Sequence, residues 1–101
     1  MHEWIAYSNG KTLGLQGSQG GTVIFDDELP NYCRLTIEKM RDDFYIRICD
    51  IYTDSFRFSF FTSEIAAVDS CKEIKVEILD WILTHPEGVS NIGWSVFFEE
   101  C

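Results

Sequence analysis

Three consecutive segments in the middle of the chain alternate hydrophobic and polar residues with a period of two. These segments cover residues 33–40, 44–51 and 56–62. The last is the clearest, because Phe56, Phe58 and Phe60 fall on one side of an extended chain and polar residues separate them. Short polar turns divide the three segments. This pattern predicts three strands of an antiparallel meander.

The hydrophobic period changes to that of a helix at residues 62–64. Thr62 or Ser63 can cap such a helix, and Glu64 suits its positive N-terminal end. From residue 64 to about residue 83, apolar residues gather on one broad face, which we expect to pack on the sheet. These are Ala67, Val68, Cys71, Ile74, Ile78, Trp81 and Ile82. Residues 84–91 are expected to end the helix, and residues 92–98 to form a last strand.

The N-terminal part of the chain is expected to add a hairpin and a short strand. Residues 3–7 are apolar enough for a strand, and Asn9-Gly10 is a dipeptide favoured in hairpin turns. Residues 11–15 would then be the return strand. A flexible polar loop should follow at residues 16–21, and a strand at residues 22–25. That strand is expected to end at Asp26-Asp27-Glu28, which we interpret as a solvated loop.

Together these elements predict one α+β domain over residues 1–101. We expect an antiparallel sheet of about five to seven strands, with one long helix in the C-terminal half packed on one face and a final strand after it. The 101 residues suit a single domain, and no repeat or linker divides them.

The charge balance narrows the classes of partner. Seventeen Asp and Glu residues face eight Lys and Arg residues, for a net charge of -9 and a pI near 4.4. Such a surface repels phosphate groups, which argues against nucleic acid and against anionic membranes as partners. It favours a basic protein partner. No apolar stretch is long enough to span a bilayer, and the first residues do not resemble a secretory signal, so we expect a cytoplasmic protein.

No motif in the sequence points to catalysis, to a cofactor or to a metal. The four cysteines form no CxxC pair and no zinc-finger spacing with the histidines. Cys33, Cys49 and Cys71 lie in hydrophobic segments and are expected in the core, whereas Cys101 is expected to be an exposed thiol. We therefore predict no catalytic residue, no cofactor-binding residue and no metal ligand.

Four carboxylates line one face of the expected helix, away from its apolar face. We call them the acidic ridge: Asp69, Glu73, Glu77 and Asp80. Like charges at i and i+4 destabilise a helix by roughly 0.2–0.5 kcal/mol per pair, so this arrangement suggests a binding role. Ile65, Val76 and Leu83 lie beside the ridge, either covered by the chain or as an exposed apolar strip. We predict a partner-binding surface made of the ridge, extended by Asp26, Asp27 and Glu28.

In size, acidity and α+β character, the chain resembles the small immunity proteins of bacterial toxin systems. The resemblance implies a non-catalytic protein-binding domain, an inhibitor that neutralises a basic, nuclease-like toxin through an acidic surface. It brings no site residue with it. Two alternatives stay open. One is an assembly subunit, and the other is a homodimeric small-ligand-binding module whose pocket would be lined by Trp4, Phe44, Phe58 and Trp94.

Overall fold

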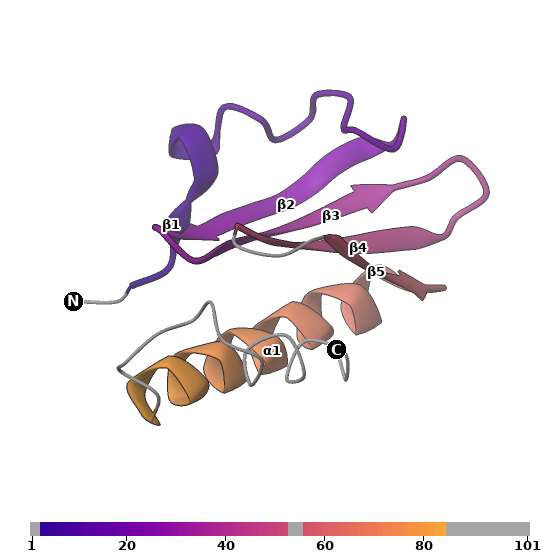
Figure 1. The fold of residues 1–101 in the computed structure, drawn as a ribbon. Coiled ribbons are helices and arrows are strands. Elements are labelled where there is room, and N and C mark those ends of the chain that lie inside the picture. The colour runs from indigo at the N-terminus through magenta and orange to yellow at the C-terminus, as the bar shows by residue number, and fades with distance from the viewer. Residues whose placement is uncertain (1–2, 53–55, 85–101) are drawn as a thin grey trace.

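Antiparallel strands build one sheet in the order in which they occur along the chain (Figure 1). The structure is a computed structural model and describes residues 3–52 and 56–84. The strands are β1 (Ile5–Ala6), β2 (Thr22–Leu29), β3 (Cys33–Lys39), β4 (Tyr45–Ile51) and β5 (Phe56–Phe61). The α+β class and the central meander are therefore confirmed.

One long helix, α1 (Glu64–Thr84), follows the sheet and packs against one of its faces. Ser63 caps the helix, because the Ala66 N–H donates a hydrogen bond to Ser63 Oγ at 3.0 Å. The residues of α1 that face the sheet are those that the helical period predicts. Ala67, Cys71, Ile74, Ile78 and Ile82 are buried, and Val68 and Trp81 are partly buried beside them.

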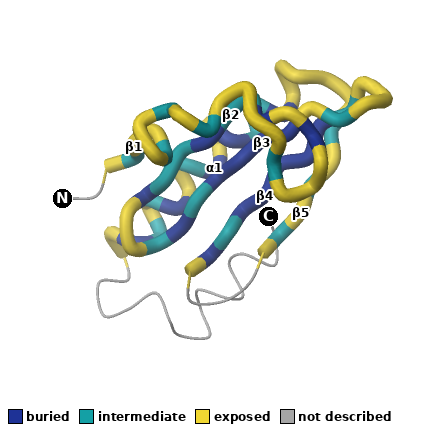
Figure 2. The backbone as a smooth tube through the Cα atoms, turned by 90° about the horizontal axis from the view of Figure 1, so that it is seen from above, coloured by how far each residue is buried: buried dark blue, intermediate teal, exposed yellow. Residues whose placement is uncertain are grey.

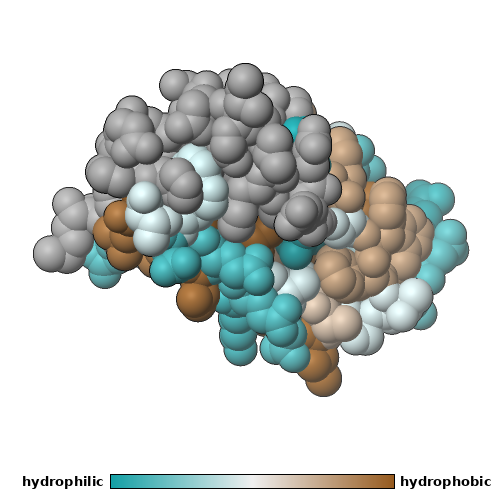
Figure 3. All heavy atoms as spheres, turned by 60° about the horizontal axis from the view of Figure 1, so that its bottom comes forward, coloured by the Kyte–Doolittle hydropathy of each residue, from teal (hydrophilic) through white to brown (hydrophobic). Residues whose placement is uncertain are grey.

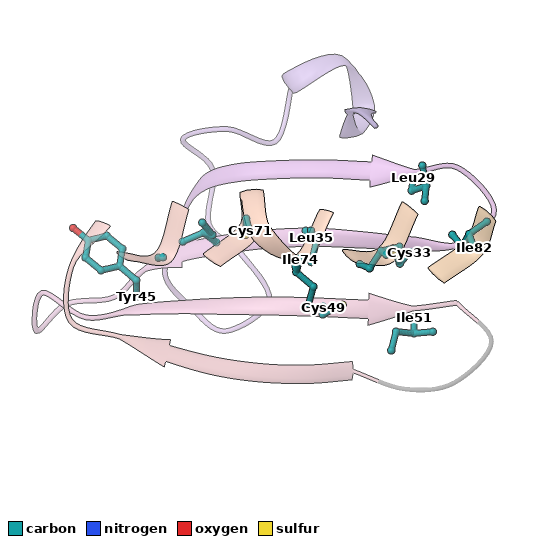
Figure 4. Close-up of a cluster of buried hydrophobic side chains, with 12 residues drawn as sticks. Leu29, Cys33, Leu35, Tyr45, Cys49, Ile51, Cys71, Ile74 and Ile82 are labelled. Atoms are coloured by element: carbon teal, nitrogen blue, oxygen red, sulfur yellow. The ribbon is translucent and has the colours of Figure 1, made fainter. Parts of the chain in front are cut away.

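The core lies between α1 and alternate residues of the central strands (Figure 4). From the strands it takes Leu29, Cys33, Leu35, Ile37, Tyr45, Cys49 and Ile51. Full burial of a large aliphatic side chain contributes roughly 1.5–3 kcal/mol, so this layer is the main source of stability. Cys33, Cys49 and Cys71 have no exposed surface, as their hydrophobic surroundings in the sequence predict.

The N-terminal segment does not form the predicted hairpin. Strand β1 has two residues and pairs with the far end of β2, where Ile5 lies opposite Glu28. The 3-10 turn η1 (Tyr7–Gly10) follows it, and in this turn Ser8 and Asn9 adopt φ values of 50° and 58°. Asn9-Gly10 thus uses its tolerance of positive φ in a compact turn, where the Lys11 N–H donates to the Ser8 carbonyl. No return strand forms at residues 11–15, although Gly14 and Leu15 exchange backbone hydrogen bonds with Val23 of β2.

Strand β2 runs through the acidic run, so the prediction of a loop there was wrong. Asp26, Asp27 and Glu28 lie opposite Thr36, Leu35 and Arg34 in the ladder with β3. Acidic residues are depleted in strands, but here each of the three carboxylates accepts a hydrogen bond from a side chain distant in sequence. These contacts offset the poor strand preference, and they cannot be read from the local sequence.

The predicted last strand at residues 92–98 lies outside the described residues. Within the part that is described, no helix combines the length and the apolar character needed to cross a membrane.

Candidate functional site

The sheet face opposite α1, which we call the open face, carries a row of exposed aromatic side chains. Phe56, Phe58 and Phe60 lie at alternate positions of β5 and are 56%, 46% and 68% exposed. The Phe56 and Phe58 rings are 6.2 Å apart and nearly parallel, and the Phe60 ring lies 6.4 Å from Phe44. We call Phe56, Phe58 and Phe60 the aromatic row. Figure 2 shows this side, where the exposed N-terminal segment covers only part of the sheet.

A hollow of about 310 Å³ lies on the open face beside the aromatic row. The segment that follows η1 borders it through Thr12 and residues 15–18, and Phe56 borders it on the side of β5. The sheet contributes Val23, Arg34, Thr36, Glu38, Ile48 and Asp50. The hollow therefore combines apolar side chains with charged ones, and three charged side chains lie within its lining.

An ion pair with a buried carboxylate anchors the N-terminal segment to the open face. Asp26 accepts hydrogen bonds from Arg34 Nε at 2.8 Å and from Arg34 Nη2 at 2.6 Å, and its side chain has no exposed surface. Thr12 and Thr36 donate to the same carboxylate. The Tyr7 ring covers the guanidinium, with 3.7 Å between Arg34 Cζ and the ring centroid. Hydrogen bonding to Asp26 raises the pKa of Arg34 above its ordinary value, so the guanidinium stays ionised.

A second buried carboxylate holds the loop at residues 16–21 in place. Glu38 is 1% exposed and accepts hydrogen bonds from the N–H groups of Gln19 at 3.1 Å and Gly21 at 3.0 Å. A Cβ atom at Gly17 would lie 2.2 Å from the Glu38 Cδ, so any larger residue there would displace the Glu38 carboxylate. The loop that we predicted to be flexible is thus fixed over a carboxylate.

Asp50 has different surroundings from these two carboxylates. It lies between Arg34 and Phe56 in the register of β3, β4 and β5, on the open face. Burial raises the pKa of Asp50, and the charge of Arg34 lowers it in part. Among the described residues, no hydrogen bond or ion pair within 4 Å engages the Asp50 carboxylate. Asp50 therefore differs from Asp26 and Glu38, whose carboxylates accept several hydrogen bonds.

The acidic ridge lies on α1, on the other side of the sheet from the hollow. Its members Asp69, Glu73, Glu77 and Asp80 are all exposed. Glu73 and Glu77 border a shallower groove of about 220 Å³ between α1 and β5. Ile65, Val76 and Leu83 are exposed. They therefore form an apolar strip beside the ridge and are not covered by the described part of the chain. Figure 3 shows the helix side, where hydrophilic side chains lie beside hydrophobic ones.

The acidic run of β2 does not join the ridge in a single surface. Asp26 is buried under the N-terminal segment, whereas Asp27 is on the α1 side of the sheet and pairs with Lys75. Glu28 accepts a hydrogen bond from the Tyr52 hydroxyl at 2.5 Å. The alternation of side chains along β2 sends neighbouring carboxylates to opposite faces. Burial, together with this hydrogen bond, raises the pKa of Tyr52 well above its ordinary value.

The aromatic residues that we considered as a pocket lining do not come together. Trp4 packs against the core, with Lys75 Nζ at 5.5 Å from its ring centroid. Phe44 and Phe58 lie on or near the open face, and Trp94 is outside the described residues. Sequence reasoning found the row of Phe56, Phe58 and Phe60 as one side of a strand. It missed the roles of Arg34 and Asp50, because these depend on strand register.

No cluster of three or more His, Cys, Asp and Glu side chains within residues 3–52 and 56–84 could hold a metal ion. Comparison with known proteins gave no match of this chain to any family model, curated protein or solved structure.

Proposed function

We propose that this chain is a non-catalytic protein-binding domain and that the open face is its binding surface. The observation that carries the proposal is the aromatic row, whose three phenylalanines are 46–68% exposed on a sheet face that no helix of the described residues covers. The solvated face of an antiparallel sheet usually presents polar side chains. Exposed apolar patches mark binding surfaces, and aromatic residues are enriched at the centres of protein interfaces.

The charge of the chain supports a basic partner. A net charge of -9 attracts positively charged proteins over long distances and speeds their encounter. The acidic ridge on α1 strengthens this field, while contact with the aromatic row would supply most of the affinity. The finer form of the proposal is an inhibitor of a basic, nuclease-like toxin in the cytoplasm, as in the immunity proteins that the chain resembles.

Affinity capture from the source organism with matched baits tests the proposal. One bait carries Phe58→Ser with Phe60→Ser, and its control carries Ile65→Ser with Val76→Ser, two apolar positions on α1 that are at least as exposed. We expect the unmodified chain and the α1 variant to recover the same basic protein, and the aromatic-row variant to lose it. Equal recovery by both variants, with circular dichroism showing intact folds, would contradict the proposal.

A second candidate uses the same aromatic row for self-association. Two copies could bury the row against each other, because a homodimer forms through the same surface on both subunits. Light scattering on the purified chain over a range of concentrations distinguishes the candidates. A monomer favours binding to another protein, whereas a dimer that the Phe58→Ser, Phe60→Ser variant disrupts favours self-association.

The hollow supports a site for a small ligand less well than the open face supports a protein-binding surface. Its volume of about 310 Å³ is at the low end of the pockets that bind small molecules. Two of its charged groups are already engaged, since Arg34 binds Asp26 and Glu38 binds the backbone of the adjacent loop.

A further inference from the structure

We propose that the hollow beside the aromatic row accepts an arginine side chain of the partner protein, with Asp50 binding the guanidinium and Phe56 covering one of its faces. The inference rests on the proposed binding function and specifies the residue that the partner inserts.

The register of the sheet places the two side chains correctly. Asp50 and Phe56 are directly opposite each other in the β4–β5 ladder, and both border the hollow. Residues opposite each other in an antiparallel pair have Cβ atoms about 5 Å apart. A carboxylate and an aromatic ring at that spacing match the two recognition modes of a guanidinium, which hydrogen-bonds along its edge and stacks through its face.

The charges in and next to the hollow favour a cation. Asp26 and Arg34 compensate each other through two hydrogen bonds. The hydrogen bonds to the Glu38 carboxylate come from neutral N–H and hydroxyl groups, so they bring no positive charge to it. Asp50 adds a carboxylate that no hydrogen bond or ion pair among the described residues engages. A positively charged side chain would restore the solvation that this partly buried carboxylate has lost.

The apolar part of the lining suits the stem of an arginine. Leu15, Val23 and Ile48 border the same hollow as Asp50. Arginine buries its methylene stem along apolar surface while its charged end meets a polar group. A small inorganic cation would use the carboxylate and leave this apolar lining in water.

Titration with a blocked tripeptide tests the assignment independently of the partner. The probe is acetyl-Gly-Arg-Gly-amide, and its counterpart carries citrulline, which is similar in shape and uncharged. Backbone amide shifts in the NMR spectrum report binding, and we expect the arginine peptide to shift residues around Thr36, Ile48 and Asp50. We expect Asp50→Asn to weaken binding about tenfold, as loss of a charged hydrogen bond implies, and Phe56→Leu to weaken it as well. Asp42→Asn, in an exposed turn, should leave binding unchanged.

Three results would overturn the assignment. These are equal binding of the citrulline peptide, equal binding of a lysine peptide, or equal effects of Asp50→Asn and Asp42→Asn. If the arginine peptide fails to bind while the aromatic-row variant still loses the captured partner, the arginine site is wrong and the binding function stands. If the peptide binds but the aromatic-row variant captures the partner normally, the binding function through the row is wrong.

Discussion

The buried carboxylate of Asp26 forms an ion pair with Arg34 in which it binds two nitrogens of the partly buried guanidinium, at 2.8 Å and 2.6 Å. The pair joins β2 to β3 on the open face, and Thr12 of the N-terminal segment donates to the same carboxylate. The border of the hollow at Thr12 is thus held by a hydrogen bond to this ion-paired carboxylate rather than by the hydrophobic core.

The first prediction concerns the stability that this pair maintains. Asp26→Ala should lower the free energy of unfolding by about 3 kcal/mol, because it leaves a partly buried guanidinium without its carboxylate. Asp27→Ala, the next residue of the same strand, is the control. Its pair with Lys75 is partly exposed and should contribute at most about 1 kcal/mol. Urea unfolding measures both values, and equal losses would show that the buried pair has no special role.

The second prediction concerns the loop over Glu38. Gly17→Ala should destabilise the fold by about 2 kcal/mol, because its Cβ would overlap the buried Glu38 carboxylate and force it to shift. Ser18→Ala should have little effect, since the Ser18 hydroxyl donates only a long hydrogen bond of 3.4 Å to Glu38. Thermal unfolding measures the stability of the two variants. An unchanged stability of Gly17→Ala would show that the loop moves aside freely.

The third prediction concerns alkaline pH. Burial raises the pKa of the Cys71 thiol from its ordinary value of 9.0 to about 12, so the folded state holds the neutral thiol. The stability from this neutral thiol is fully present below pH 9 and is lost as the pH rises toward 12. Tyr52, whose pKa is also raised, contributes in the same direction.

Urea unfolding at pH 7, 9 and 11 measures this loss. Cys71→Ala should lose less stability between pH 9 and 11 than the unmodified chain, and Tyr52 accounts for part of the loss that remains. Parallel curves for the two proteins would exclude the thiol as a source of the pH dependence. At pH 8, native Cys71 should resist a thiol reagent that modifies it rapidly in urea.

The fourth prediction concerns the acidic ridge and needs the partner. Glu73→Lys with Glu77→Lys should slow association with a basic partner and flatten the dependence of the association rate on salt, without changing the fold. The control reverses two other exposed acidic residues, Glu3 and Asp42, and so alters net charge equally. Stopped-flow measurements at several ionic strengths give the rates. If only the ridge variant associates more slowly, the ridge faces the approaching partner. Equal association rates for the unmodified chain and both variants would leave the ridge a role in solubility alone.

The periodicity of the sequence predicted much of the fold. The switch from a period of two to a helical period fixed the central strands, α1 and the buried face of the helix. It could not predict which sheet face α1 covers, because alternation defines two faces of a strand without showing which of them is buried. Phe56, Phe58 and Phe60 are more hydrophobic than the polar residues between them, yet they lie away from the helix.

The candidate site was harder to predict than the fold. Asp26 is paired with Arg34, eight residues away, and Asp50 lies opposite Phe56, only because the strands meet in one particular register. A shift by a single residue would send each side chain to the other face. The hairpin predicted at Asn9-Gly10 failed for a related reason, since its dihedral preferences suit both a hairpin and the 3-10 turn that forms.

Photo-crosslinking from matched positions distinguishes a partner bound on the open face from one bound on α1. The photoreactive residue p-benzoylphenylalanine is placed either at Phe60, in the aromatic row, or at Val76, on α1, and both positions are 68% exposed. Each protein is irradiated in the source organism, and covalent adducts are identified by mass spectrometry. We expect one dominant adduct with a basic protein from position 60 and little or none from position 76. An adduct that forms from position 76 and not from position 60 would contradict this expectation.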